Sequence, residues 1–277
     1  MSLRKESVLP LVDVSDLHVG CGMAIMPRDF VDDMGASHPP SPLQSKLIDW
    51  WDGADGFWPW VKRECPDGFD VVIGGDVIDG MHHENATHWT ANIDVQRRAA
   101  IQLLRPVREM ARRFFIVRGT ETHVGKSGQD EEAIARELDA EKSPEGTRSH
   151  WEMYYRLGRH LISITHHIGT TSSPFAESGA LNREMVHGYV EAGRWGDEPP
   201  AMYLRHHRHT CGVFGHPSQH GMSWSVTCPA WQLKTPYGYR SGFRMQRPQV
   251  GGVIAVAGDN SPYVKVWTRT VERTREV

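Results

Sequence analysis

The chain has 277 residues, a formal net charge of -3 and 39% hydrophobic residues, and no apolar run approaches the ~20 residues that a membrane span requires. These values exclude a membrane protein, and the acidic balance argues against a broad basic surface that grips nucleic acid through many phosphates. We expect one domain over residues 1–277, with loop insertions at about 21–42 and 229–249. Residues 1–7 lead directly into a strand-like segment without the apolar stretch of a secretory signal, so the expected compartment is the cytoplasm.

The numbers and spacing of cysteines and histidines indicate which kinds of site the chain can form. The four cysteines are far apart and form no CxxC pair, so we expect small, buried, reduced thiols rather than a zinc knuckle or a disulfide framework. The sixteen histidines are the compositional anomaly. Histidine is the commonest metal ligand and a frequent acid–base group, and several of these histidines lie in pairs after predicted strands.

The first predicted strand covers residues 8–16, an apolar run that ends at Asp16 and His18. Residues 21–42 contain four prolines, and we expect a long loop without regular structure. A helix should follow, with Ser41 as its N-cap. The tryptophans near this helix are expected to hold it on the core, because too few basic residues are interleaved for stacking on nucleic-acid bases.

The second strand is the central feature of the sequence. The β-branched run from Val71 to Ile73 ends in two glycines and then presents Asp76 and Asp79, three positions apart. Ligands of α/β proteins bind at the carboxyl ends of strands. We therefore expect Asp76 to lie in a functional site, with a polar loop over residues 81–88 after it.

Helices and strands alternate in the middle of the chain. A helix is predicted over residues 93–113, a third strand over 114–117 and a charged helix over 129–142. The third strand also ends in a glycine followed by polar ligand types, from Gly119 to His123. This alternation indicates an α/β protein.

The second half of the chain is richer in strands. A hairpin over residues 151–165 ends in His166 and His167, and a short strand over 202–205 runs into His207 and His209. The remaining predicted elements are a helix over residues 175–193 and strands over 223–227, 250–257 and 263–268. The last two strands are joined by a hairpin turn.

Five strand-like segments thus end, in chain order, in Asp16-x-His18, Gly75-Asp76-x-x-Asp79, Gly119-Thr120-Glu121-Thr122-His123, His166-His167 and His207-x-His209. Over about residues 8–215 this order resembles the calcineurin-like metallophosphoesterase superfamily, whose motifs are DxH, GDxxD, GNH followed by an acid, HG or HH, and GHxH. The resemblance implies an α/β fold, a four-layer α/β/β/α sandwich with two mixed β-sheets, and a phosphoesterase with two divalent metal ions. The segment from Trp231 to Arg240 is also similar to the corresponding region of phage-encoded members, and we expect it to cover the active site.

The resemblance also implies roles for single residues. Asp76 would bridge the two metals, Asp16, His18 and His209 would complete one site, and His166 and His207 would belong to the other. Imidazole and carboxylate ligands suit manganese, iron, zinc, nickel or cobalt, and manganese is the metal we expect. Asp79 would support catalysis by orienting a ligand histidine or its own loop. His206 stands before His207 where the superfamily usually has glycine.

The third motif departs from the superfamily pattern, because two residues separate Thr120 from His123. In the favoured register, Glu121 replaces the asparagine as an oxygen ligand, and His123 is the counterpart of the catalytic histidine that contacts the phosphoryl or departing oxygen. In the other register, which remains open, Thr120 takes the asparagine's position and Glu121 lies outside the ligand set.

The expected reaction is in-line attack on phosphorus by a hydroxide that bridges the two metals, with His123 assisting the departing oxygen. Phosphodiesters are favoured over monoesters as substrates, and a nucleotide or single-stranded nucleic acid is the expected partner. A nuclease for single strands and a non-catalytic metal-binding scaffold stay open as alternatives. The candidate substrate contacts are His82, His83, Arg118, Arg208 and Arg240, because such groups can bind phosphate oxygens.

Overall fold

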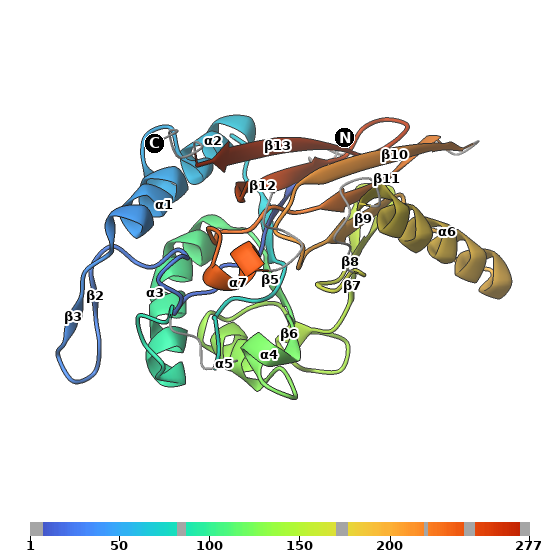
Figure 1. Cartoon of the computed structure of the whole chain (residues 1–277). Coiled ribbons are helices and arrows are strands. Elements are labelled where there is room, and N and C mark those ends of the chain that lie inside the picture. Colours follow the sequence, from blue (N-terminus) through green and yellow to red (C-terminus); the bar gives the residue numbers. More distant parts are fainter. Residues whose placement is uncertain (1–7, 82–86, 170–176, 219–220, 241–246, 272–277) are drawn as a thin grey trace, which may run out of the picture.

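The computed structural model describes residues 8–81, 87–169, 177–218, 221–240 and 247–271. Figure 1 shows strands in the centre of the molecule and helices on either side of them. In chain order the elements are β1 (Leu11–Val14), β2 (Phe30–Val31), β3 (Ser37–His38), α1 (Pro42–Asp52), α2 (Phe57–Glu64), β4 (Asp70–Ile73), α3 (Ile93–Met110), β5 (Phe114–Val117), α4 (Glu121–Val124), α5 (Gln129–Glu137), β6 (Ser149–His150), β7 (Met153–Leu157), β8 (His160–Ile164), α6 (Glu177–Trp195), β9 (Met202–Arg205), β10 (Gly212–Ser218), β11 (Gly221–Thr227), α7 (Pro236–Arg240), β12 (Gln249–Val256) and β13 (Tyr263–Thr270).

The larger strands form two mixed sheets. One sheet has six strands in the order β13-β12-β1-β4-β5-β6, in which β1, β4, β5 and β6 are parallel and β12 pairs antiparallel with both β1 and β13. The other has five strands in the order β10-β11-β9-β8-β7, in which β11, β9 and β8 are parallel. The parallel strands of each sheet end at one edge, so the loops that follow them gather there.

The two sheets and the helices form four layers. Along β1, Val12 and Val14 belong to the core shared with α1, α2, α3 and α5, whereas Leu11 belongs to the core between the two sheets. This alternation follows from the two-residue repeat of a strand. On the far side of the five-stranded sheet, Leu181 of α6 packs near Phe214 of β10. The predicted α/β/β/α order is therefore confirmed.

Most predicted elements are present, although the helices predicted over 93–113 and 129–142 end at Met110 and Glu137, and the short helices α4 and α7 were not predicted. The helix after Ser41 begins as expected. The Ser41 hydroxyl accepts a hydrogen bond from the backbone N–H of Gln44, and the Gln44 side-chain oxygen accepts one from the backbone N–H of Ser41. Residues 21–42 were expected to lack regular structure but contain the short β2–β3 hairpin. Strands β6 and β10 were not predicted, because β6 has two residues and β10 is an exposed edge strand that accommodates Pro217.

The tryptophans of the α1–α2 region pack into the core, as predicted. The Trp51 ring lies edge-on to the Trp231 ring at 4.6 Å and to the Trp58 ring at 5.4 Å. The four cysteines are unpaired, and all but Cys211 are buried. In the part of the chain that the structure describes, no helix combines the length and the hydropathy that crossing a bilayer requires.

A polar tie joins the two sheets at the start of β4. The buried Asp70 carboxylate accepts hydrogen bonds from the guanidinium groups of Arg112 and Arg113, and from the Tyr155 hydroxyl of β7 at 2.6 Å. Burial alone would raise the pKa of Asp70, but these three donors outweigh it and hold the pKa at about 2. The carboxylate is therefore ionised, and each donor stabilises it.

Replacing Tyr155 by Phe should remove one of these donors and lower the free energy of unfolding by about 1.5–3 kcal/mol, the usual contribution of a hydrogen bond to a charged group. Urea denaturation of the full chain measures this. The matched control is Tyr154→Phe, because the Tyr154 side chain is 57% exposed and its hydroxyl can bond to water. Equal losses in the two variants would contradict the role of the Asp70 tie.

Candidate metal centre

The residues of the three candidate metal-binding groups follow the carboxyl ends of five strands. These are β1, β4 and β5 of one sheet and β8 and β9 of the other, and each leads into a loop. Backbone hydrogen bonds join the loops to each other: His18 N donates to Asp76 O at 2.9 Å, and His206 N donates to His166 O at 3.1 Å. Between the sheets, His207 N donates to Asp16 Oδ2 at 3.2 Å.

Three overlapping groups of side chains could each hold a metal ion. The ligand atoms within each group lie within 4.8 Å of one another. The groups are Asp16 with His18 and His209, His18 with Asp76 and His123, and Asp76 with His166 and His207. All seven residues had been singled out from the sequence, and His18 and Asp76 each belong to two groups.

The first group is compact and partly unsatisfied. His209 Nε2 lies 3.2 Å from Asp16 Oδ1 and 3.2 Å from His18 Nε2. Asp16 Oδ1 is buried and has no hydrogen-bond partner among the described residues. A buried carboxylate oxygen that faces two imidazoles without a bond is the arrangement expected where a cation binds between them.

The group around Asp76 shows the same feature. His166 Nε2 lies 3.1 Å from Asp76 Oδ2, yet it makes no hydrogen bond with correct geometry to any described residue. The other ring nitrogen, Nδ1, donates to the backbone carbonyl of Gly74 at 2.7 Å. This bond fixes the ring so that Nε2 is directed at the carboxylate, as is usual for metal-binding histidines.

The backbone at the candidate ligands adopts a conformation that is rare for residues with a side chain. Asp16, His18, Asp76, His207 and His209 have φ between 44° and 69°. Among the described residues, Asp139 is the one other non-glycine residue with positive φ. Such conformations cost about 1–3 kcal/mol each and persist mostly at functional sites. Their concentration on the predicted ligands supports a shared function.

The electrostatics of the site favour ionised carboxylates. Burial raises the pKa of Asp76, but the charges of His166, His123 and His18 outweigh it and hold the pKa well below the usual value. Burial likewise lowers the pKa of His166, but the Asp76 carboxylate outweighs this effect and raises it to about 10. An arriving cation would therefore compete with a proton on His166.

The loop after β5 contacts Asp76 through Thr120. Thr120 donates to Asp76 Oδ1 from its backbone N–H at 2.7 Å and from its hydroxyl at 3.0 Å. Glu121 lies exposed in the first turn of α4 and belongs to none of the three groups. These contacts favour the register in which Thr120, rather than Glu121, takes the position of the superfamily's asparagine.

Asp79 supports three histidines at once. Its Oδ1 lies 3.3 Å from His18 Nδ1, its Oδ2 lies 2.8 Å from His88 Nε2, and its backbone carbonyl lies 2.6 Å from His123 Nδ1. The His123 ring lies edge-on to the His18 ring at 4.4 Å. Burial and the charge of His18 lower the pKa of His123 to about 4. Asp79 thus lies beside the candidate ligand His18, and its orienting role stays a prediction.

The predicted substrate contacts lie in different surroundings. Arg118 is buried, bonded to Ser149 Oγ at 2.8 Å and placed over the Trp151 ring, so it holds its own loop. Arg208 is also buried and donates to the backbone carbonyl of Gly169. Arg240 is exposed at the end of α7. His82 and His83 lie outside the described residues.

The aromatic segment that begins at Trp231 has two parts. Trp231 itself is fully buried, and its backbone N–H donates to the carbonyl of Asp16 at 3.0 Å, so it stabilises the loop after β1 that carries Asp16 and His18. Tyr237 and Tyr239 of α7 are 74% and 63% exposed. The part that could meet a substrate is therefore α7, which Figure 1 places near the centre of the molecule.

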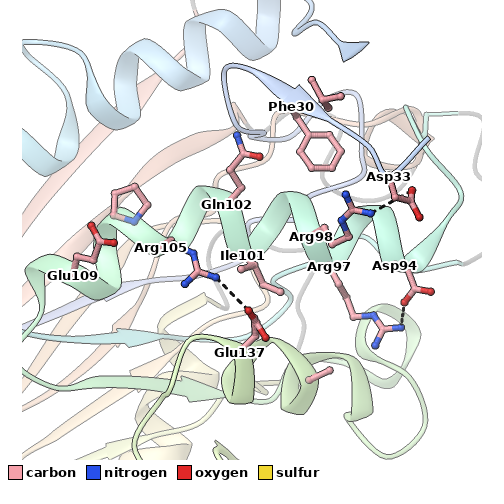
Figure 2. A pocket seen from close by; sticks show the side chains of 13 residues that line it. Phe30, Asp33, Asp94, Arg97, Arg98, Ile101, Gln102, Arg105, Glu109 and Glu137 are labelled. Carbon is pink, nitrogen blue, oxygen red and sulfur yellow. Dashed lines mark hydrogen bonds and ion pairs between the residues drawn. The ribbon is translucent and has the colours of Figure 1, made fainter. Parts of the chain in front are cut away.

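The described residues also form a groove of about 790 Å³ between the β2–β3 hairpin, α3 and α5. Figure 2 shows that arginines of α3 face carboxylates there: Arg98 lies 3.3 Å from Asp33 and Arg105 lies 3.4 Å from Glu137. None of the candidate ligands lines this groove. With these cations already paired, the groove is a poor site for a phosphate.

No family model and no curated protein matches the chain. Among solved structures, a metallophosphoesterase from Sphaerobacter thermophilus is 10% identical at a TM-score of 0.38, with 96% of this chain and 90% of that chain covered. Vacuolar protein sorting 29 from Cryptosporidium parvum is 12% identical at a TM-score of 0.36, with 95% and 98% covered. A predicted phosphoesterase from Streptococcus pneumoniae is 10% identical at a TM-score of 0.36, with 94% and 98% covered.

These likenesses are too distant to assign an activity, and none of the three proteins supports a phage origin. The layers of the fold and the order of motifs at the strand ends agree with the resemblance found in the sequence. The structure therefore has the four-layer fold that the resemblance in the sequence implied.

Glu131 of α5 is a site residue that the sequence did not reveal. It is fully buried behind Asp76, and its two oxygens accept from the backbone N–H groups of Gly119 at 2.6 Å and Val77 at 3.1 Å. It therefore joins the loop after β4 to the loop after β5. It was not among the residues selected from the sequence, although its spacing of three and seven positions from Ile134 and Leu138 places it on the buried face of this helix.

Gly119 allows the close approach of these two loops. A Cβ at this position would lie 2.1 Å from Asp76 Oδ1 and 2.3 Å from Asp76 N. We expect Gly119→Ala to displace the Asp76 loop and to lower the free energy of unfolding by about 1–3 kcal/mol, as measured in urea. Gly193→Ala is the control, because the space around Gly193 in α6 is open and alanine favours a helix. A Gly119→Ala variant as stable as the control would refute the close approach.

Glu131 should make the stability of the metal-free protein depend on pH. Burial and the Asp76 charge raise its pKa to about 8, although the two backbone donors oppose them. Between about pH 5 and 8 the folded state then holds a proton that the unfolded state has lost, so the free energy of unfolding falls as the pH rises. In Glu131→Gln this part of the decline should vanish. Urea titrations in a chelator test this, and parallel profiles for the two proteins would exclude it.

Proposed function

We propose that the chain is a metal-dependent phosphoesterase that binds two divalent cations, with manganese preferred, and hydrolyses phosphodiester bonds in the cytoplasm. One observation carries the proposal: three ligand groups overlap through His18 and Asp76, so two neighbouring cations would share a ligand. A phosphate ester resists attack because it is anionic, and a pair of cations bridged by a carboxylate is a common solution.

The ligands divide between the two cations. Asp16, His18 and His209 would hold one, His166 and His207 would hold the other, and Asp76 would lie between them. The cations would supply charge neutralisation at the phosphate and an acidified water molecule. Asp79 would keep the His18 ring in place, since its Oδ1 lies 3.3 Å from His18 Nδ1.

His123 would move a proton through Nε2. The Asp79 carbonyl can only accept, so Nδ1 of His123 must donate to it, and the neutral ring presents Nε2 as an acceptor. The lowered pKa keeps this ring neutral near pH 7. Nε2 can then take a proton from the attacking water and give it to the departing ester oxygen.

The substrate class follows from the surface at α7. Tyr237 and Tyr239 are exposed, Lys234 Nζ lies 5.0 Å from the centre of the Tyr239 ring, and Arg240 follows at the end of the same helix. Aromatic rings beside a cation can stack on a base and contact its phosphate. We therefore take a nucleotide or a short single-stranded nucleic acid as the substrate, rather than a long duplex.

Metal analysis together with hydrolysis of a chromogenic bis-aryl phosphate tests the proposal. The Mn²⁺-loaded protein should contain about two metals per chain and cleave the diester faster than the aryl monoester. Asp76→Asn should abolish metal pairing. His123→Ala should lower turnover by about 10²–10⁴-fold with unchanged metal content, as expected for loss of an acid–base group. His187→Ala on the exposed face of α6 is the control.

Three outcomes would change the assignment. Folded, metal-replete protein that cleaves neither ester would leave a metal-binding scaffold as the function. Loss of a metal in His123→Ala would make His123 a ligand, which its place in the group with His18 and Asp76 allows geometrically. Cleavage of a single-stranded oligonucleotide, but not of the small diester, would identify a nuclease.

A further inference from the structure

Asp13 is a carboxylate buried where the strand pattern calls for an apolar residue. It lies in the middle of β1 and is 0% exposed. Because alternate residues share a face of a strand, Asp13 points with Leu11 into the core between the two sheets. A buried carboxylate is unfavourable unless a specific partner compensates it.

The partner is His206, the residue that precedes the candidate ligand His207. His206 is also 0% exposed, and its Nε2 lies 3.0 Å from each oxygen of Asp13. Its other ring nitrogen, Nδ1, donates to the backbone carbonyl of Thr165 at 2.9 Å. Both ring nitrogens thus face acceptors on different sheets, and the ring has no freedom to rotate.

The His206 ring also contacts two other parts of the centre. It lies nearly parallel to the His166 ring, at 6.1 Å and 19°. It rests on Gly74, where a Cβ would lie 2.2 Å from His206 Nε2. Gly74 in turn accepts the hydrogen bond that orients His166. One side chain therefore touches the loops after β4 and β8 and begins the loop after β9.

We propose that Asp13 and His206 form a positioning pair that sets the metal-binding geometry of His207, His209 and His166. His207 and His209 have φ of 69° and 55°, so the turn that carries them is strained and must be held at its start. The His206–Asp13 contact provides that hold across the two sheets. This role rests on the metal centre proposed above.

The decisive variant replaces both partners by apolar residues, Asp13→Val together with His206→Leu. Removing both groups leaves no unpaired buried charge, so the metal-free protein should remain folded with a stability in urea close to that of the wild type. Its affinity for Mn²⁺, measured by calorimetric titration of the full chain, should fall by about tenfold, as is typical when the support of metal ligands is lost. The visible spectrum of bound Co²⁺ should also change.

Tyr155→Phe is the control, because Tyr155 also joins the two sheets but at the opposite end of β4. It should lose stability and keep its Mn²⁺ affinity within about twofold, since it supports no metal ligand. Asp13→Asn, which keeps the shape of the side chain, should weaken Mn²⁺ binding in the same direction as the double variant.

Three other outcomes would contradict either the positioning role of the Asp13–His206 pair or the metal centre itself. If the double variant binds Mn²⁺ as tightly as the wild type, the pair has no positioning role while the metal centre stands. If Tyr155→Phe weakens binding equally, general packing of the sheets explains the effect and the pair is again excluded. If the wild type binds neither Mn²⁺ nor Zn²⁺, both the proposed metal centre and the positioning role of the pair are excluded.

Discussion

The Asp76 carboxylate is the group on which the rest of the site depends. It is almost fully buried at the end of β4, where water cannot compensate its charge. Thr120 reaches it from the loop after β5, and His166 approaches it from the other sheet at 3.1 Å. His166, His123 and His18 keep the carboxylate ionised. The contacts of Asp76 with Thr120 and His166 bring together loops from two sheets that share no strand pair.

The backbone conformations at this site are unfavourable, and contacts with the surrounding structure stabilise them. Five candidate ligands have left-handed backbone conformations, each unfavourable by about 1–3 kcal/mol. Bonds between loops hold them: Glu131 accepts from the loops after β4 and β5, and Trp231 N donates to Asp16 O. The buried aromatic cluster around Trp231 and Trp51 then fixes the first loop to the helical layer. The backbone strain is confined to the ligand loops, whereas the contacts that offset it come from both sheets.

The sequence predicted the strands and the candidate ligands that follow them, because both can be recognised from patterns of neighbouring residues. Apolar runs located β1, β4 and β5, and the polar residues after them identified Asp16, His18 and Asp76. It could not predict contacts between distant segments. The contacts of Glu131 with Gly119 and Val77 join separate segments, and Asp13 and His206 looked unrelated, being 193 positions apart. The third motif stayed ambiguous because spacing alone does not show whether Thr120 or Glu121 turns toward Asp76.

Asp79 links the two tasks that the centre would perform. Its carboxylate supports His18, a candidate metal ligand, and its backbone carbonyl orients His123, the candidate proton carrier. A shift of the loop after β4 would therefore alter the metal position and the direction of His123 Nε2 together. Glu131 also accepts a hydrogen bond from Val77 N in the same loop, so the proposed metal binding and proton transfer would both depend on the position of this loop. The His123 and His18 rings lie 4.4 Å apart between their centres, so a movement of Asp79 would displace both rings together.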